Sequence, residues 1–243
     1  MKQEHILAID IGGTSIKATV LNTSGEMLVE YQKVPTPEKA SPENVIKAIK
    51  KLTANFPSFD KISVGFPGYV KKGIIATAPN LGTPLWAGCN LALLIAKELK
   101  KPVRLLNDAD MQGFGLISGE GLEMVITLGT GFGTALFMDG SLLPHLELAH
   151  LPVRKNLTYD KFIGDDALIE DGLEEWNKNV KDVLKTFKTV INYDKLYLSG
   201  GNAKKITFKL DDNIKIARNR DGIKGGAFMW QKDDDFCVQS VNP

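Results

Sequence analysis

Two stretches of the sequence have a residue pattern suited to holding phosphate groups. Residues 9–20 and 126–137 each run from an apolar strand through a glycine- and threonine-rich turn into a second apolar strand. Each is followed by a hairpin signal, Ser24-Gly25 and Asp139-Gly140, so the sequence contains an internal duplication. Such turns offer backbone N–H groups and hydroxyls with no side chain in the way, and two facing copies could hold a polyphosphate. The predicted phosphate-binding residues of the turns are Gly12, Gly13, Thr14, Gly129, Thr130 and Gly131.

Asp10 stands at the end of the first strand, beside the first of these turns. An acid next to a phosphate-sized turn is a place for Mg²⁺ bound through water, so Asp10 is the predicted metal residue. Neither stretch matches the G-x-x-x-x-G-K-[ST] loop, which argues against the P-loop class. The simpler alternative is a pair of ordinary β-hairpins, because glycine and threonine are common in turns.

Asn107 and Asp108 follow the apolar strand 103–106 and precede a predicted helix. Either side chain could simply cap that helix. A carboxylate at a helix N-terminus is also biased towards its ionised form and could accept the proton of an attacking hydroxyl.

Glu147 and His150 are three residues apart, so on a helical turn they share a face. Together they could accept and donate hydrogen bonds to neighbouring sugar hydroxyls. The alternative is a surface acid beside a histidine satisfied in the core. No cysteine follows to complete a tetrahedral set, so no structural zinc is expected.

Five predicted strands end in polar or glycine-rich residues, and in an open α/β sheet ligands bind beyond the carboxyl ends of the strands. We expect these five segments to converge on one cleft. One of them holds Gly200, Gly201 and Asn202, which could lie against an adenosine moiety or could merely start a helix. The five segments are residues 10–14, 65–68, 106–108, 129–131 and 199–202.

The predicted elements describe an α/β protein of two lobes, residues 1–107 and a larger lobe of residues 108–243. The last predicted helix, from about residue 225, could pack back on the first lobe. In the second lobe a long helical stretch is expected to be interrupted near Gly172. Its predicted inward residues are Leu173, Trp176, Val180, Val183, Leu184 and Phe187. The predicted strands are 6–10, 16–21, 27–34, 61–64, one near 73–78, 103–106 and 195–198, and the other helices begin near 41, 90 and 108.

The composition is that of a soluble globular protein, with 43% hydrophobic and 24% charged residues in 243. Thirty basic residues against 29 acidic ones give no argument for binding nucleic acid or a membrane surface. Cys89 and Cys237 lack metal-like spacing and are expected to be unpaired thiols. Without a signal-peptide pattern or a long apolar stretch, a cytoplasmic location is expected.

These motifs together resemble the ROK sugar kinases of the actin-like ATPase superfamily, and most closely their polyphosphate glucokinase branch. The resemblance covers most of the chain. The segments that carry it are residues 10–17, 106–110, 128–140 and 198–205.

The resemblance implies two lobes of RNase H-like topology, hinge closure and often a homodimer. It implies Asp108 as the general base, and sugar binding by Asn107, Asp108, Glu147 and His150. Gly68 and the region of Asn80 would help to shape the sugar pocket, and Lys17 in the first motif would bind phosphate. The implied reaction is Mg²⁺-dependent transfer of a phosphoryl group from ATP or inorganic polyphosphate to the 6-hydroxyl of glucose.

The sequence departs from the family pattern in places. Ala149 replaces the glycine of the Glu-x-Gly-His element, the cysteine-rich zinc segment is absent, and a further family acid has no clear counterpart, although Asp165 and Asp166 are near. A kinase for another hexose or an N-acylated amino sugar, or a non-catalytic sugar sensor, therefore stays open. The chain starts at its first strand with no helix-turn-helix before it, which disfavours a transcription factor. Without a G-x-G-x-x-G motif, a Rossmann oxidoreductase is disfavoured too.

Overall fold

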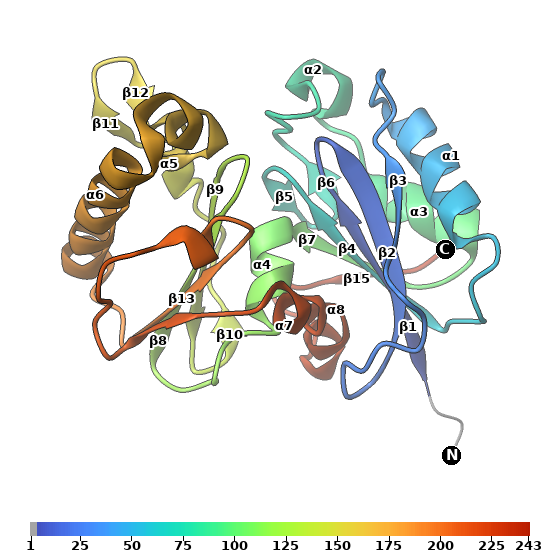
Figure 1. Cartoon of the computed structure of the whole chain (residues 1–243). Helices are drawn as coiled ribbons and strands as arrows, with labels where there is room; N and C mark the ends of the chain where they lie inside the picture. The colour runs from blue at the N-terminus through green and yellow to red at the C-terminus, as the bar shows by residue number, and fades with distance from the viewer. Residues whose placement is uncertain (1–3) are drawn as a thin grey trace. The chain divides into compact units, whose positions relative to one another are not determined.

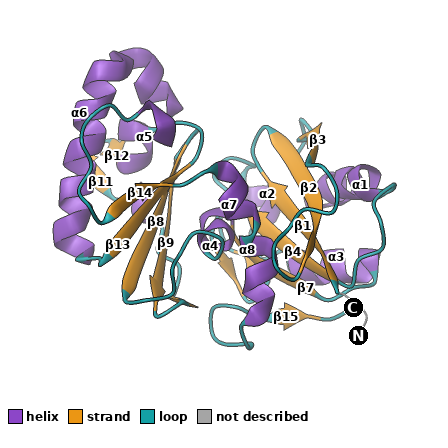
Figure 2. Ribbon diagram, turned by 60° about the horizontal axis from the view of Figure 1, so that its bottom comes forward, coloured by secondary structure: helices purple, strands orange, loops and turns teal. Residues whose placement is uncertain are grey.

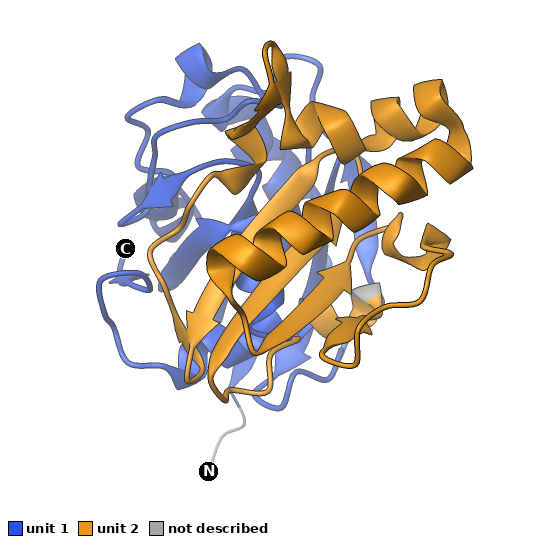
Figure 3. Cartoon of the chain, turned by 90° about the vertical axis from the view of Figure 1, so that its left-hand side faces the viewer, with its two compact units in different colours: residues 1–115, 223–243 blue, residues 116–222 orange. Residues whose placement is uncertain are grey.

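The structure, a computed structural model, describes residues 4–243 and divides into two compact units. Unit 1 comprises the chain up to residue 115 together with residues 223–243, and unit 2 comprises residues 116–222 (Figure 3). The predicted lobes were divided at residue 107 instead. In the structure the segment that follows the last parallel strand of unit 1, and the C-terminal residues, pack within unit 1.

Unit 1 is built on a six-stranded sheet with strand order β15-β7-β4-β1-β2-β3 (Figure 1). The three central strands β1, β4 and β7 are parallel, and the outer strands run antiparallel to their neighbours. The carboxyl ends of the three parallel strands therefore meet at one edge of the sheet. The strands are β1 (His5–Ile11), β2 (Ser15–Asn22), β3 (Gln32–Pro35), β4 (Lys61–Phe66), β7 (Val103–Asn107) and β15 (Ser240–Val241).

Helices cover both faces of this sheet (Figure 2). Along β1 the side chains alternate, so Leu7 and Ile9 join the main core with helices α1 and α3, whereas Ile6 and Ala8 pack against Ala227 of α8. The segment from residue 225 thus packs on the unit 1 sheet. The other elements of unit 1 are α1 (Pro42–Thr53), β5 (Val70–Lys71), β6 (Ile74–Ile75), α2 (Thr83–Trp86), α3 (Leu91–Leu99), α4 (Asp108–Gly113), α8 (Gly225–Phe228) and η3 (Met229–Gln231).

Arg104 of β7 fixes the C-terminal segment to the unit 1 sheet. Its buried guanidinium donates to Asp234 Oδ1 at 2.5 Å and to the backbone carbonyl of Lys232 at 2.9 Å, and it lies 4.6 Å from the ring centroid of Trp230. Ser240 also donates to Asp234 through its N–H and its hydroxyl, both at 2.9 Å. Partial burial raises the pKa of Asp234, but these hydrogen bonds outweigh it and leave the pKa below its ordinary value.

We therefore expect Asp234→Asn to lower the melting temperature at neutral pH and to lose this effect in acid. A carboxyl whose pKa is lowered by folding stabilises the fold above its unfolded pKa, about 4, and this contribution disappears as the pH falls through the lower folded pKa. Thermal melts of both proteins from pH 7 to pH 2.5 should converge below about pH 4. Asp233→Asn is the matched control, because Asp233 is exposed; a gap between Asp234→Asn and the parent that stays constant with pH would contradict the assignment.

Unit 2 repeats the strand pattern of unit 1. Its sheet has the order β10-β9-β8-β13-β14, in which β8, β13 and β14 are parallel and β9 is antiparallel to β8. In both units the first two strands form the hairpin that carries the glycine–threonine turn, so the predicted duplication is confirmed at the level of the sheets. The strands are β8 (Leu122–Leu128), β9 (Phe132–Met138), β10 (Ser141–Leu142), β13 (Lys195–Ser199) and β14 (Ile214–Ile216).

The long helix α6 (Asp165–Ile191) covers one face of the unit 2 sheet (Figure 3). Its chain breaks at Gly172, which has a φ of 78°, as the sequence predicted. Most of the predicted inward residues are buried, but Leu173 is exposed because the break resets the helical phase immediately before it. The remaining short elements are η1 (Leu148–His150), β11 (Pro152–Arg154), β12 (Leu157–Thr158), α5 (Tyr159–Ile163), η2 (Ala203–Lys205) and α7 (Asn219–Ile223).

Two predicted strands are shorter than expected. Of residues 27–34 only the end lies in β3. Met27 forms an isolated bridge with Leu21, and the chain then leaves the ladder until Gln32, with the carbonyl of Val29 accepting the Thr19 hydroxyl at 2.6 Å. The strand near 73–78 is reduced to β6, in a two-stranded hairpin apart from the main sheet.

Both cysteines are unpaired, as predicted. Among the described residues, none of the helices combines the length and the apolar character needed to cross a bilayer.

Candidate active site

Asp10 and Asp108 lie at the same edge of the unit 1 sheet. Asp10 pairs with Gly65 of β4, and Gly65 pairs with Leu106 of β7, two residues before Asp108. With neighbouring strands about 4.8 Å apart, the backbones of β1 and β7 are about 10 Å apart at this edge. The two carboxylates predicted to hold metal and to accept a proton thus come from the ends of two strands of one unit that are separated by β4.

Gly65 creates the space in which Asp108 sits. A Cβ at position 65 would lie 3.2 Å from the Cα of Asp108 and 2.9 Å from the terminal methyl group of Met111. Any side chain there would displace the first turn of α4. Sequence analysis assigned Gly65 only to a loop, and its role follows from this close approach.

Asn107 caps the N-terminus of α4 and also forms a hydrogen bond with the loop that contains Gly68. Its buried amide oxygen accepts the N–H of Ala109 at 2.8 Å, and its amide nitrogen donates to the carbonyl of Gly68 at 3.2 Å. The capping interpretation is therefore confirmed. Asp108 Oδ1 also accepts the Ala109 N–H, at 2.9 Å, in the first turn of α4.

The first glycine–threonine turn is held in place by Thr36, which sequence analysis did not identify. The Thr36 hydroxyl donates to the carbonyl of Gly12 at 2.6 Å, and its N–H donates to the carbonyl of Thr14 at 3.0 Å. A Cβ on Gly13 would lie 3.4 Å from the Cβ of Asn80, so Asn80 borders the turn. Thr36 lies 24 residues from Gly12 in a segment without a motif, and no sequence signal identifies it.

The charges around Asp10 suit a magnesium–phosphate site. Lys17 Nζ lies 3.3 Å from Asp10 Oδ2, and the Asp10 side chain is 18% exposed. Burial, helped by the charge of Asp10, raises the pKa of Tyr31. The described residues contain no group of three or more histidine, cysteine or acidic side chains arranged for a metal. A single carboxylate nevertheless fits Mg²⁺, which is commonly bound by one or two carboxylates with water and substrate phosphates.

The second glycine–threonine turn and the loop of Gly200 to Asn202 come together in unit 2. The N–H of Asn202 donates to the carbonyl of Leu128 at 3.0 Å, and its amide nitrogen donates to Asp165 Oδ1 at 2.6 Å. A Cβ on Gly129 or on Gly201 would meet nothing within 4 Å, so both backbones are open to a ligand. The predicted phosphate and nucleotide contacts of unit 2 therefore form one surface.

Asp160 and Asp165 border this surface. Asp160 Oδ1 accepts the N–H of Phe132 at 2.8 Å and closes the turn behind Gly131. Asp165 starts α6 and binds Asn202. Sequence analysis noted Asp165 as near the expected family acid but gave no role to Asp160.

Glu147 lies between two histidines. Its Oε2 is 3.7 Å from Nε2 of His150, and its Oε1 is 3.7 Å from Nε2 of His145. The His145 side chain is 6% exposed, whereas that of His150 is 49% exposed. The predicted Glu147–His150 pair is thus brought together by η1, which Glu147 precedes and His150 ends. His145 was missed, although its position two residues before Glu147 could have suggested it.

The strand order shared by both units, with phosphate-type turns at corresponding hairpins, defines an actin-like ATPase fold of the sugar kinase type. The model of the ROK family matches residues 6–150, and the chain belongs to that family.

Comparisons with known proteins agree with this family assignment. A polyphosphate glucokinase of Mycobacterium tuberculosis is 30% identical over 93% of this chain and 87% of its own length. The solved structure of an inorganic polyphosphate/ATP-glucomannokinase from Arthrobacter sp. strain KM has a TM-score of 0.84 and 29% identity, covering 94% of this chain and 100% of the other. A ROK family glucokinase from Streptomyces griseus, solved with glucose and AMPPNP, shares the fold with a TM-score of 0.79 at 18% identity, over 92% and 98% of the two chains.

Proposed function

We propose that this protein is a glucokinase that transfers a phosphoryl group from ATP or inorganic polyphosphate to the 6-hydroxyl of glucose. The observation that carries the proposal is the position of Asp108, packed over Gly65 at the sheet edge that also presents Asp10. The similarity to polyphosphate glucokinases over most of the chain supports the choice of substrates.

In this reaction Asp108 accepts the proton of the glucose 6-hydroxyl while that oxygen attacks the terminal phosphorus. Glu147 and His150 bind sugar hydroxyls, and Asn107 positions Gly68 beside the sugar. His145 lies beside this carboxylate, with its Nε2 at 3.7 Å from Glu147 Oε1. Catalysis then depends on orientation and on a correctly placed base, and side chains form no covalent intermediate.

The glycine–threonine turn of each unit stabilises negative charge on the phosphoryl oxygens through backbone N–H groups. Lys17 adds a positive charge beside Asp10. Asp10 would hold Mg²⁺ through water, and the ion, when bound, neutralises charge on the phosphate chain. Gly200, Gly201 and Asn202 contact the nucleotide when ATP is the donor.

The direct test is an assay of the purified protein with Mg²⁺, combining ATP or polyphosphate with a panel of sugars. We expect glucose 6-phosphate from both donors. Phosphoryl transfer at background for every combination would favour the sugar-sensor alternative.

Mannose is the second candidate acceptor, because the Arthrobacter protein is a glucomannokinase and Ala149 alters the sugar-binding element. The ratio of kcat/KM for mannose to kcat/KM for glucose shows which of the two sugars is the preferred acceptor. A homodimer remains a prediction, to be measured by light scattering.

Glu147→Gln should weaken glucose binding about tenfold or more, the usual effect of losing a hydrogen bond to a charged group. Calorimetric titration with glucose measures the change. Glu174→Gln is the control, because Glu174 is 89% exposed and pairs with Lys178 on the surface of α6. Unchanged glucose affinity in Glu147→Gln would remove Glu147 from the sugar site.

A further inference from the structure

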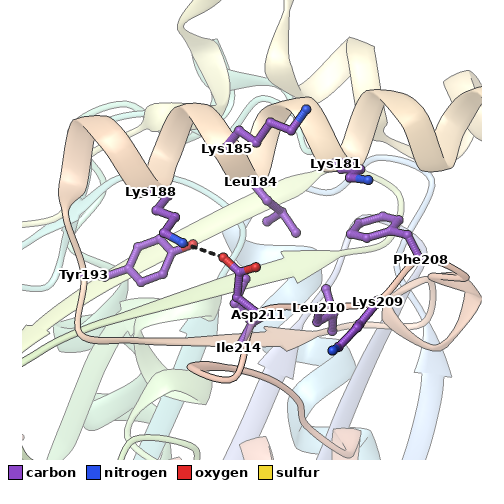
Figure 4. Close-up of a pocket in the computed structure, with 10 residues that line it drawn as sticks. All are labelled: Lys181, Leu184, Lys185, Lys188, Tyr193, Phe208, Lys209, Leu210, Asp211 and Ile214. Atoms are coloured by element: carbon purple, nitrogen blue, oxygen red, sulfur yellow. Dashed lines mark hydrogen bonds and ion pairs between the residues drawn. The ribbon is translucent and has the colours of Figure 1, made fainter.

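Unit 2 contains a small cavity that the proposed reaction does not use. It has a volume of about 100 Å³ and lies between the C-terminal half of α6 and the chain that leads into β14 (Figure 4). Tyr193 and Ile214, which line it, lie at the starts of β13 and β14, whereas Gly200 follows the end of β13. The cavity and the glycine loops are therefore at opposite ends of the parallel strands of this unit.

The cavity is strongly basic. Lys181, Lys185 and Lys188 project from one face of α6, since their spacing of four and three residues keeps them in line, and Lys209 comes from the facing segment. Asp211 is the one acidic residue of the lining, and Lys188 pairs with it at 2.6 Å.

The remaining lysines are only partly neutralised. Lys185 pairs with Asp182 outside the cavity at 3.0 Å. Within the described chain, Lys181 and Lys209 have no carboxylate in ion-pair distance, and the Lys181 ammonium lies 5.8 Å from the ring centroid of Phe208. The lining thus carries a surplus of positive charge on exposed lysines, which attracts an anion.

Tyr193 supplies an independent sign of a ligand. Its side chain lines the cavity, the residue is 6% exposed, and its buried hydroxyl has no hydrogen-bond partner in the described structure. In Figure 4 this hydroxyl lies close to the Lys188–Asp211 pair. Buried polar groups are rarely left without a partner, so a bound group is expected to accept from it.

The protonation of Tyr193 is suited to that role. Burial, with a contribution from the charge of Asp211, raises the pKa of Tyr193 to about 12. The hydroxyl therefore keeps its proton at neutral pH and can donate it in a hydrogen bond.

We propose that this cavity binds a phosphate-bearing anion, with the Tyr193 hydroxyl donating to a phosphoryl oxygen and the lysine ammonium groups neutralising its charge. Lysine is a common phosphate ligand as a point charge, and several lysines match the multiple charge of phosphate better than that of one carboxylate. Free phosphate, a polyphosphate chain and a nucleotide all present this chemistry. The site uses residues of unit 2 only and does not depend on the proposed kinase activity.

Methyl NMR of the full chain tests the site directly, because Leu184, Leu210 and Ile214 line the cavity. Orthophosphate, inorganic tripolyphosphate and ADP are titrated separately. We expect at least one probe to shift these methyl signals, and the most effective probe identifies the source of the phosphate group. Tyr193→Phe should weaken that binding about tenfold or more, as should the double variant Lys181→Gln/Lys209→Gln.

Lys178→Gln is the matched control, because Lys178 is on the same helix, pairs with Glu174 and Glu175, and does not line the cavity. The affinity of Lys178→Gln for the most effective probe should equal that of the parent. Failure of all three probes to shift the methyl signals, or equal affinity in Tyr193→Phe, would overturn the proposal. The readout is independent of glucose phosphorylation, so failure here is distinguishable from failure of the proposed function.

Thermal melting of Tyr193→Phe gives a second criterion. Because the hydroxyl has no protein partner, the ligand-free variant should melt at or above the temperature of the parent. The active probe should raise the melting temperature of the parent more than that of the variant. A lower melting temperature for the ligand-free variant would assign the hydroxyl to the fold and contradict the proposal.

Discussion

Asp108→Asn should lower kcat by about 10² to 10⁴ while glucose still binds with nearly its original affinity, as expected when a general base is lost. The asparagine oxygen can still accept the N–H of Ala109, which Asp108 Oδ1 accepts at 2.9 Å, so the start of α4 should persist. What disappears is the negative oxygen that takes the proton of the attacking hydroxyl. Steady-state kinetics with ATP and with polyphosphate, and calorimetry with glucose, separate these effects.

The decrease in kcat should be the same with ATP and with polyphosphate, because the proton that Asp108 accepts comes from the sugar and not from the phosphoryl donor. Asp212→Asn provides the control, since Asp212 is an exposed acid of unit 2 outside the proposed site. Turnover near that of the parent in Asp108→Asn would remove Asp108 from the chemistry. A lower melting temperature with a proportional loss of glucose binding would instead assign it a structural role.

Strand ends were the most predictable part of this molecule. The carboxyl ends of β1, β4 and β7 could be recognised because an apolar run stops at a polar or glycine residue, as at Asp10, Gly65 and Asn107. Because parallel strands place their carboxyl ends at the same edge of a sheet, the sequence is enough to predict that these residues lie close together. The duplicated hairpins likewise led to two sheets with the same strand order.

The errors came from local interactions that override a pattern. The Thr19 hydroxyl binds the carbonyl of Val29 within the gap that interrupts the strand expected from residue 27, and the positive φ of Gly172 takes Leu173 out of phase with the rest of α6. An apolar pattern indicates which residues prefer to be buried. It does not indicate where a side chain forms a hydrogen bond with the backbone and so interrupts a strand or helix.

Side-chain partners distant in sequence were not predictable. Thr36 secures the first turn from a position 24 residues from Gly12 that belongs to no motif. The two interpretations of Asn107 also proved compatible, since one amide can cap α4 and bind the carbonyl of Gly68. We predict that residues of both units act on the same sugar and phosphoryl donor. The Asp108 variant tests this for unit 1, and the Glu147 variant tests it for unit 2.

Gly200→Ala should destabilise the protein by about 3 kcal/mol, because the residue combines a positive φ with a close backbone approach. Its φ is 90°, and a Cβ there would overlap the carbonyl of Leu128, the last residue of β8. The N–H of Asn202 donates to that same carbonyl at 3.0 Å, so an alanine must push β8 and the loop apart and break this bond. For a chain of this size the loss corresponds to roughly 6 to 12 °C in melting temperature.

Gly201→Ala separates this packing effect from ligand binding at the neighbouring position. A Cβ at 201 meets nothing within 4 Å, so its melting temperature should stay close to that of the parent. Its added methyl group would instead project into space open to a nucleotide, and the KM for ATP should rise while the KM for glucose is unchanged. Equal melting temperatures for the two alanine variants would show that the end of β8 does not depend on the close contact at Gly200. A melting temperature that falls only in Gly200→Ala would establish that this glycine holds the second phosphate turn against the nucleotide loop.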